Sequence, residues 1–260
     1  MKIRSPYDRL DLKINKKDRV LEIGPGHNPS FRSNVLAEKF VDTNYHRCGD
    51  VKIYPHQTFV NADGENLPFK DKEFDYTICC HVLEHADNPV KFVKEQCRVS
   101  KRGYIEAPSM IGEYLFPKKS HKWVILEIDK KLVLYEKAKM SENYACDYGE
   151  VFLNYLPFQS LAYRLLWYTR GNIMNVCYEW EDDIEIIVNP QDEYYLSFFT
   201  KKWDRQMSEK IFPPQTLFKD IRNTLKAACY LLINTLKGKI RNRQPLELSE
   251  YMKVKGIDAP

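Results

Sequence analysis

The run Val20–Gly26 is a short apolar segment that contains an acidic residue and ends in a glycine turn, a combination that can bind a ligand. It reads Val-Leu-Glu-Ile-Gly-Pro-Gly, and Glu22 lies two residues before Gly24. Glycines at such a turn let the backbone approach a ligand closely, because no side chain is in the way. A dinucleotide site would show a third glycine three residues after Gly26, but Pro29 is found there. The run therefore favours a ligand with a cationic amino-acid end, which Glu22 can bind, over a pyrophosphate.

Two further acidic positions suit a nucleoside. Asp42 follows Glu22 by 20 residues, at the end of a predicted strand, where a carboxylate can accept hydrogen bonds from ribose hydroxyls. Asp63 could accept an adenine amino group, and the backbone at Gly64 and Glu65 could meet the ring edge. The structural alternatives are that Asp42 caps a turn and that Asp63-Gly64 is an ordinary turn between strand and helix.

The spacing of apolar residues predicts the strands and helices that position these residues. Short apolar runs predict strands, and wider spacing predicts helices at 31–39 and 88–97. The predicted strands cover 19–23, 40–42, 59–62, 74–80 and 104–107. Strands that alternate with helices favour an α/β domain, with a mainly parallel sheet and helices on both faces.

After Pro108 the alternation stops, and we expect one domain over 1–200 with an insertion or lid at about 110–172. The segment 123–136 predicts a β-hairpin with a polar turn, 155–168 an aromatic helix, and 175–188 β structure. We expect these segments to continue the sheet and build the lid. Their aromatic side chains are either core and lid material or a surface that stacks on sugar rings.

Residues 201–260 predict a basic, helical C-terminal extension. They carry 13 Lys and Arg against 6 Asp and Glu, a net charge of +7 in a chain whose total is +4. The segment 217–240 predicts one amphipathic helix with lysines beside an apolar stripe. Members of the stripe are Leu217, Phe218, Ile221, Leu225, Cys229, Leu232, Leu236 and Ile240. This helix could contact a membrane surface, pair with a second copy as a homodimer, or dock on its own domain.

Composition narrows the class of protein. The 260 residues are 43% hydrophobic and 29% charged, which is ordinary for a folded globular chain. Seven cysteines without a C-x-x-C pair predict neither a disulfide framework nor a metal site. Free thiols, a charged N-terminus and the absence of an apolar run of about 18 residues predict a cytoplasmic protein, which could lie at the surface of the inner membrane.

Taken in order, these motifs resemble those of the class I methyltransferases that use S-adenosylmethionine (SAM), in particular the type 11 group. The resemblance covers roughly residues 18–108. It rests on Val20–Gly26, Asp42, Ala62–Phe69, Phe74-Asp75, Val82–His85 and Arg98–Gly103. Two departures are a glycine loop that reads Gly-Pro-Gly-His-Asn-Pro and a Lys-Arg-Gly turn in place of Lys-Pro-Gly-Gly. The resemblance implies a Rossmann-like, seven-stranded sheet that is mainly parallel, with SAM as the cofactor.

The resemblance also implies roles for particular residues. Glu22, Gly24, Pro25 and Gly26 would line the methionine and ribose side of SAM, and Asp42 would hold the ribose. Asp63, Gly64 and Glu65 would meet the adenine, while Cys80 and His81 would lie near the methyl group. No metal is implied.

A hydroxyl acceptor would benefit from a general base, and histidine suits neutral pH. The candidates are His81, His85 and His121, of which His81 and His121 are preferred as catalytic residues. His85 is more typical of a helix end. His121 lies in a basic, aromatic-flanked segment, although such a segment can also be a surface loop that leads into a strand.

The segment after Pro108 is similar to that of bacterial methyltransferases in surface-polysaccharide pathways. We therefore expect O-methylation of a glycan or a sugar-containing intermediate. The alternatives are a small-molecule or lipid-precursor methyltransferase and a non-catalytic SAM-binding scaffold subunit. The basic tail would allow RNA as a substrate, but no RNA-binding module is recognised, so no nucleic-acid partner is expected.

Overall fold

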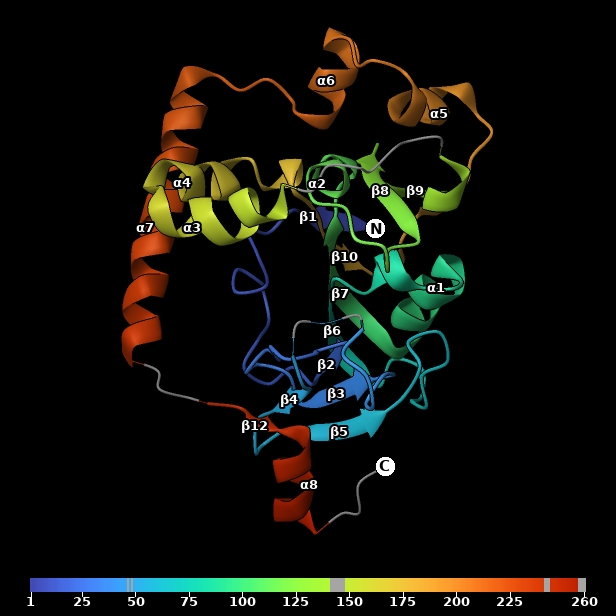
Figure 1. Cartoon of the computed structure of the whole chain (residues 1–260), viewed down its shortest axis with the longest axis vertical. Helices are drawn as coiled ribbons and strands as arrows, with labels where there is room; N and C mark the ends of the chain where they lie inside the picture. The colour runs from blue at the N-terminus through green and yellow to red at the C-terminus, as the bar shows by residue number, and fades with distance from the viewer. Residues whose placement is uncertain (46, 48, 141–147, 241–243, 257–260) are drawn as a thin grey trace.

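A seven-stranded sheet forms the centre of the molecule (Figure 1). The computed structural model describes residues 1–45, 47, 49–140, 148–240 and 244–256. The strand order is β1-β10-β7-β6-β2-β3-β5. The bounds are β1 (Lys2–Arg4), β10 (Asn175–Glu181), β7 (Ser100–Pro108), β6 (Phe74–Cys80), β2 (Val20–Ile23), β3 (Val35–Glu38) and β5 (Thr58–Asn61).

The strand directions confirm the predicted mainly parallel sheet. The strands from β7 to β5 run parallel, whereas β10 is antiparallel to β7 and β1 is antiparallel to β10. The chain proceeds from β2 toward β5 and then returns to β6 on the other side of β2. Ligands of open α/β sheets bind beyond the carboxyl ends of the strands at such a reversal. The fold therefore places a candidate site at the ends of β2 and β6.

The connection from β2 to β3 differs from the prediction. Residues 24–34, all of which the structure describes, form turns, and the predicted helix at 31–39 and strand at 40–42 are both wrong. Every residue of Val35–Glu38 is buried, and this run pairs with both β2 and β5. A strand covered on both faces is apolar along its length, so its pattern is easily read as part of a helix.

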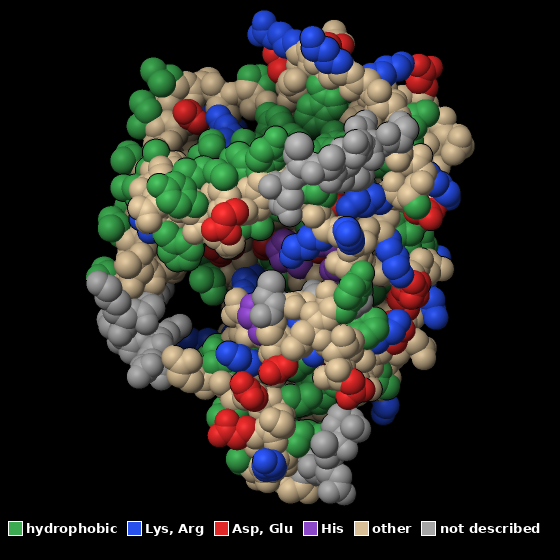
Figure 2. Space-filling view, viewed as in Figure 1, with side chains coloured by type: hydrophobic (Ala, Val, Ile, Leu, Met, Phe, Trp, Pro, Cys, Tyr) green, Lys and Arg blue, Asp and Glu red, His purple; other side chains and the backbone are tan. Residues whose placement is uncertain are grey.

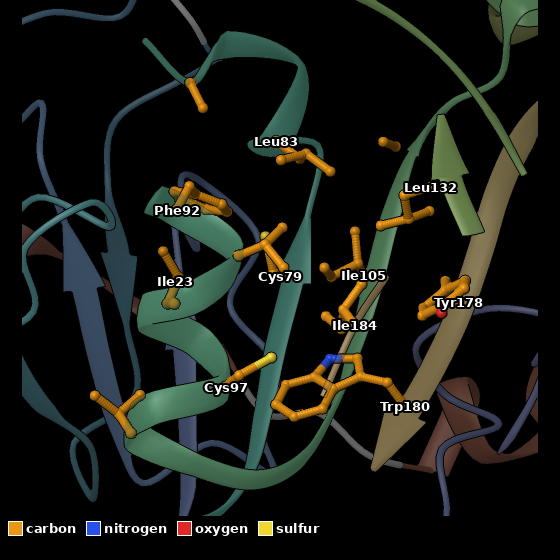
Figure 3. Packing of buried hydrophobic residues seen from close by; sticks show 14 of the residues in the cluster. Ile23, Cys79, Leu83, Phe92, Cys97, Ile105, Leu132, Tyr178, Trp180 and Ile184 are labelled. Atoms are coloured by element: carbon orange, nitrogen blue, oxygen red, sulfur yellow. The ribbon is translucent and has the colours of Figure 1, made fainter. Parts of the chain in front are cut away.

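Helix α1 (Pro89–Val99) covers one face of the sheet (Figure 3). The Asn88 side chain accepts a hydrogen bond from the Lys91 N–H group and so caps the helix. Phe92, Val93 and Cys97 of the helix pack into a cluster with Ile23, Cys79, Leu83, Ile105 and Trp180. The helix predicted at 88–97 is confirmed.

The opposite face is covered mainly by chain without regular structure. Leu12 and Ile14 of the N-terminal segment pack on Val20, Tyr76 and Tyr104. Farther along, α8 (Leu248–Lys255) places Tyr251 and Met252 against Leu36, and β12 (Leu246–Glu247) pairs with β4 (Lys52–Ile53). The last part of the C-terminal extension is therefore part of the core.

The predicted hairpin forms but does not continue the main sheet. Strands β8 (Trp123–Ile128) and β9 (Lys131–Glu136) join β11 (Ile186–Val188) in a separate three-stranded sheet. Of the predicted additions it is β10 that extends the main sheet, because β10 pairs with β7 along its whole length. Trp123 and Leu132 of the hairpin pack into the same cluster as α1.

The aromatic segment at 155–168 is helical in pieces. A π-helical turn (Glu150–Tyr155) leads into α3 (Leu156–Gln159) and α4 (Leu161–Thr169). The smaller helices are η1 (Leu83–His85), α2 (Met110–Leu115), η2 (Lys137–Lys139), η4 (Gly171–Ile173), α5 (Glu193–Thr200) and α6 (Arg205–Ile211).

Helix α7 (Leu217–Ile240) has the predicted bounds and lies beside α4 (Figure 1). Ala227 is buried, and the ring of Tyr230 contacts Tyr7 and Tyr168. The members of the predicted apolar stripe from Leu217 to Leu236 face away from the domain, and Leu225 and Leu232 are 61% and 67% exposed. The side chain of Ile240 lies outside the described residues. Among the described residues, no helix combines the length and the apolar character needed to cross a membrane.

Candidate active site

Two cavities meet at the carboxyl ends of β2, β3 and β6. The first has a volume of about 100 Å³ and is lined by Glu38, Asp63, Gly64, Glu65 and His85, among others. The second, of about 420 Å³, is lined by Glu22, Pro25, Gly26, Cys80 and His81, among others. Gly24 lines both. Figure 2 shows histidine side chains in a hollow near the middle of this face.

The glycine turn after β2 requires its glycines. Gly24 has a φ of +64° and Gly26 a φ of +52°, a region that side chains rarely allow. A Cβ atom on Gly24 would lie 2.4 Å from the Cγ2 atom of Val82. The Gly24 N–H group donates to the Ala37 carbonyl oxygen at 2.8 Å. The turn is thus held close to both neighbouring strands.

Glu22, predicted to bind the methionine end of SAM, lines the second cavity, and it also supports the glycine loop. Its Oε2 atom accepts hydrogen bonds from the Ser30 N–H group at 2.8 Å and the Ser33 hydroxyl at 2.7 Å. Arg9 Nη1 lies 3.6 Å from its other oxygen. Burial raises the pKa of Glu22, although Arg9 and the hydrogen bonds oppose this shift. The Glu22 carboxylate, which lines the second cavity, therefore already has partners within the protein.

The acidic residue at the end of β3 is Glu38, and the placement of Asp42 at a strand end is wrong. Glu38 lines the first cavity and accepts hydrogen bonds from the N–H groups of Gly26 at 3.3 Å and Phe40 at 3.2 Å. Burial raises its pKa. Asp42 is exposed, and neither cavity, as the described residues form it, includes Asp42. The run Val-Leu-Ala-Glu, three apolar residues followed by Glu38, is the sequence pattern that could have predicted a strand ending in an acidic residue.

The Asp63–Glu65 turn, predicted to meet the adenine, lines the first cavity. Asp63 forms an ion pair with Lys39, whose Nζ is 2.8 Å from Oδ2, and accepts a hydrogen bond from the Glu65 N–H group. Burial opposes ionisation of Asp63, but Lys39 outweighs it and lowers the pKa. A Cβ atom on Gly64 would lie 2.3 Å from the ring of Phe92, so the turn packs directly on α1.

The second cavity contains cationic residues that the sequence analysis missed. Arg9, Arg47 and Lys118 line it together with His27. Burial lowers the pKa of His27, and these neighbouring positive charges lower it further. The three residues come from separate segments without a shared motif, so only the fold brings them together. The cavity can attract a carboxylate or another anionic group.

His81 lies just after β6 and lines the second cavity, as expected. Its φ is +57°, and its side chain is 48% exposed. Its ring nitrogens lie 3.6 Å from Glu84 Oε1 and 3.3 Å from Glu106 Oε1. Burial alone would lower the pKa of His81, but the two carboxylates raise it to about 10. His81 is therefore a cation at neutral pH, which argues against its predicted role as a general base.

Cys80, expected near the methyl group, and His121, the second preferred catalytic residue, have different environments. Burial raises the pKa of the Cys80 thiol well above its ordinary value, so Cys80 is a neutral lining group. His121 is only 6% exposed, and its Nδ1 atom lies 2.5 Å from Glu113 Oε2. Neither cavity, as formed by the described residues, includes His121. Of the two preferred catalytic residues, His81 therefore borders a cavity and His121 is buried behind it, beside Glu84.

Part of the chain that forms these cavities also matches a known protein family. Residues 33–105 match the model of the methyltransferase domain family. This stretch is therefore similar to part of a methyltransferase domain. The match begins within the β2–β3 connection and ends in β7, so it includes Glu38 and the Asp63–Glu65 turn.

Two curated relatives match parts of the chain. An uncharacterized protein of Methanocaldococcus jannaschii is 45% identical over 64 residues, which cover 22% of this chain and 31% of that protein. Norajmaline N-methyltransferase of Rauvolfia serpentina is 35% identical over 77 residues, which cover 30% of this chain and 25% of that protein. The chain thus spans about a quarter to a third of the length of these relatives.

Among solved structures, the YcgJ protein of Bacillus subtilis superposes with a TM-score of 0.32 and 20% identity, over 42% of this chain and 56% of that one. The SAM-dependent methyltransferase of Thermotoga maritima has a TM-score of 0.27 and 22% identity, over 38% and 46% of the two chains. These are partial superpositions. The α7 and α8 extension lies outside the family match.

Proposed function

We propose that this chain is a methyltransferase that uses SAM. The observation that carries the proposal is the pair of cavities that meet at Gly24, with a buried carboxylate, Glu38, at the adjoining strand end. Together the cavities have the volume typical of a small-molecule site, roughly 300–1,000 Å³. The family match over residues 33–105 supports the same activity.

The residues present fit SAM. Glu38 would accept hydrogen bonds from the ribose hydroxyls, and Asp63 and Gly64 would border the adenine in the first cavity. In the second cavity, Glu22 would face the amino group of the methionine end, and Arg9 and Arg47 would attract its carboxylate. SAM supplies a methyl group that its sulfonium already activates. The protein then has to hold the acceptor in line with that methyl group.

We further propose that the acceptor is a hydroxyl of a glycan or a sugar-containing intermediate. The second cavity is lined by charged and hydrogen-bonding groups, including His81, Glu106 and Lys118. Such groups suit a hydroxyl-rich acceptor better than an apolar one. A small-molecule acceptor is the alternative, supported by the relative that is named as a norajmaline N-methyltransferase.

Two measurements test this proposal in sequence. SAM and its demethylated product should each raise the melting temperature of the full chain, because a ligand that binds the folded state stabilises it. Incubation with isotope-labelled SAM should then transfer label to a glycan acceptor, detected by mass spectrometry. Absence of stabilisation by either compound would contradict SAM binding. Stabilisation without a labelled product from glycans, small molecules or lipid precursors would favour a scaffold subunit.

We also propose that the exposed stripe of α7 contacts a membrane surface. Leu225 and Leu232 project from the domain, and Arg222 and Lys226 are exposed on the same helix. An apolar stripe with basic neighbours is the pattern of an interfacial helix. Figure 2 shows further apolar side chains over the α3–α4 region beside it, where Phe158 and Leu161 are exposed. Charge complementarity favours anionic lipid over a second copy of this basic helix.

A further inference from the structure

Three side chains with metal-binding atoms converge beside the two cavities. Glu84 and His85 come from η1, which directly follows β6, and His121 comes from the segment before β8. Each side chain offers a ligand atom, and these atoms all lie within 4.8 Å of one another. His85 lines the first cavity. Glu84 Oε1 is 3.6 Å from His81 Nδ1, and His81 lines the second cavity.

The Glu84 carboxylate is buried without hydrogen bonds. The residue is 1% exposed, and neither of its oxygens has a hydrogen-bond partner among the residues that the structure describes. The nitrogens near it, His81 Nδ1 and His121 Nε2, are 3.6 and 3.9 Å away, beyond hydrogen-bond distance. A buried charge is costly unless it is paired or coordinates a metal. His81, whose Nδ1 atom lies 3.6 Å from Glu84 Oε1, offsets part of this charge but makes no hydrogen bond to it. A metal ion bound to Glu84 would supply the direct contact that neither oxygen has among the described residues.

The Nδ1 atoms of His85 and His121 both contact oxygen acceptors of the protein, as is usual for histidines that bind a metal. His121 Nδ1 lies 2.5 Å from Glu113 Oε2, and His85 Nδ1 lies 2.9 Å from the Ser120 carbonyl oxygen. Glu113 is itself buried and paired with Lys137. Metal-bound histidines usually donate their second N–H group to a carboxylate or a backbone carbonyl, which orients the ring. In His121 this arrangement assigns Nδ1 to the protein and directs Nε2 toward Glu84, and in His85 it fixes the orientation of the ring.

We propose that Glu84, His85 and His121 bind one divalent cation of the zinc class. Two imidazole nitrogens and one carboxylate oxygen suit zinc, whereas magnesium and calcium prefer oxygen ligands. Tetrahedral zinc with bonds of about 2.0–2.2 Å sets its ligand atoms about 3.3–3.6 Å apart. His121 Nε2 and Glu84 Oε1, at 3.9 Å, need to approach only slightly. This site was not expected from the sequence, because the cysteine spacing contains no zinc pattern.

The cation would join two segments that border the active site. One is the end of β6, which continues into η1, and the other is the segment that ends at β8 and also supplies Lys118 to the second cavity. Lys122 N–H donates to the Glu84 carbonyl oxygen at 2.8 Å, so the backbone already brings the segments together. The cation site does not depend on the proposed function, since it can be measured without SAM.

The experiment is a metal titration of the full chain after removal of metal with a chelator. In competition with a chromophoric chelator, Zn²⁺ should bind with a stoichiometry of one per chain and should raise the melting temperature. Co²⁺ should give the intense visible absorption of a tetrahedral site. Zn²⁺ should also slow hydrogen exchange in the segment 117–122.

Variants separate this site from adventitious binding. His85→Ala, at a partly exposed position, should weaken Zn²⁺ affinity at least tenfold, as should Glu84→Gln. His56→Ala is the matched control, because His56 is exposed and lies outside the cluster. The wild-type protein and the control should gain the same stabilisation from Zn²⁺. Unchanged affinity in both cluster variants, no stoichiometric binding, or preference for Mg²⁺ over Zn²⁺ would each overturn the proposal.

Discussion

At the scale of single residues, three carboxylates near the ends of neighbouring strands have different partners. Glu22 accepts hydrogen bonds from the loop residues Ser30 and Ser33. Asp63 is paired with Lys39. Glu38 is held by two backbone N–H groups, which leaves accepting capacity on its two oxygens. We therefore assign the ribose to Glu38.

The first prediction compares Glu38 with Asp42. Glu38→Gln should weaken SAM binding by about 10- to 100-fold, because a hydrogen bond to a charged group contributes about 1.5–3 kcal/mol. Isothermal titration calorimetry measures this loss. Asp42→Asn is the matched control and should bind SAM with unchanged affinity, since Asp42 is exposed and outside both cavities.

Folding must be checked separately in this comparison, because Glu38 also supports the Gly26 backbone. Thermal unfolding without SAM should show both variants folded. If Asp42→Asn lost affinity while Glu38→Gln retained it, the ribose assignment would return to Asp42 as the sequence first suggested.

At the scale of elements, the β8–β9 hairpin depends on a strained two-residue turn. Asp129 and Lys130 have φ values of +53° and +63°. Hairpins of right-handed twist favour turns with positive φ at both positions, which Asp-Gly adopts readily. The positive φ therefore costs conformational free energy at Lys130, which is not a glycine. The packing of the hairpin on α2 and against the main core offsets this cost.

The second prediction follows from this strain. Lys130→Gly should stabilise the protein by about 0.5–1 kcal/mol, because glycine adopts positive φ without a steric penalty. Lys131→Gly, one residue later in β9, should instead destabilise it by a similar amount, since glycine weakens a strand. Urea denaturation of the two variants measures both effects. Equal destabilisation by the two substitutions would show that the turn is not strained.

At the scale of the whole molecule, the C-terminal extension does two different things. Helix α8 returns to the sheet and buries Tyr251 and Met252. Helix α7 docks through Ala227 and Tyr230, and the Tyr230 hydroxyl donates to Asp8 at 2.6 Å. The apolar stripe of α7, which includes Leu225 and Leu232, is exposed on the outer side of the helix. Deleting the whole extension would therefore disturb the core, and point substitutions are the better test.

The third prediction concerns that stripe. Combined Leu225→Gln and Leu232→Gln should abolish sedimentation of the chain with anionic vesicles, because both leucines are more than half exposed. Arg222→Gln with Lys226→Gln should weaken binding and reduce its salt dependence. Both pairs should leave the melting temperature nearly unchanged, since surface substitutions cost little.

Light scattering distinguishes lipid from a second copy. The chain without vesicles should be monomeric. A dimer that the leucine substitutions dissociate, together with no vesicle binding, would assign the stripe to a homodimer instead. The same leucine variant should retain SAM binding, because α7 contributes no residue to either cavity as the described residues form them.

The local parts of this site were predictable from the sequence. Gly24 and Gly26 follow a short apolar run, the Asp63–Glu65 turn has a recognisable composition, and α1 and α7 show helical periodicity. Each of these features depends on residues within a few positions of one another, so local propensity and spacing carry the information. The sequence by itself therefore determined the α/β class, the glycine turn and the Asp63–Glu65 turn.

The tertiary structure decided which residues that are far apart in the sequence lie close together in space. The register of β3 between β2 and β5 selects Glu38 over Asp42, because parallel pairing is set by neighbours and not by the strand alone. The cluster of Glu84, His85 and His121 forms only when the segment before β8 folds onto η1. Equally, packing of α7 through Ala227 and Tyr230 decides that its apolar stripe faces outward, which periodicity cannot reveal.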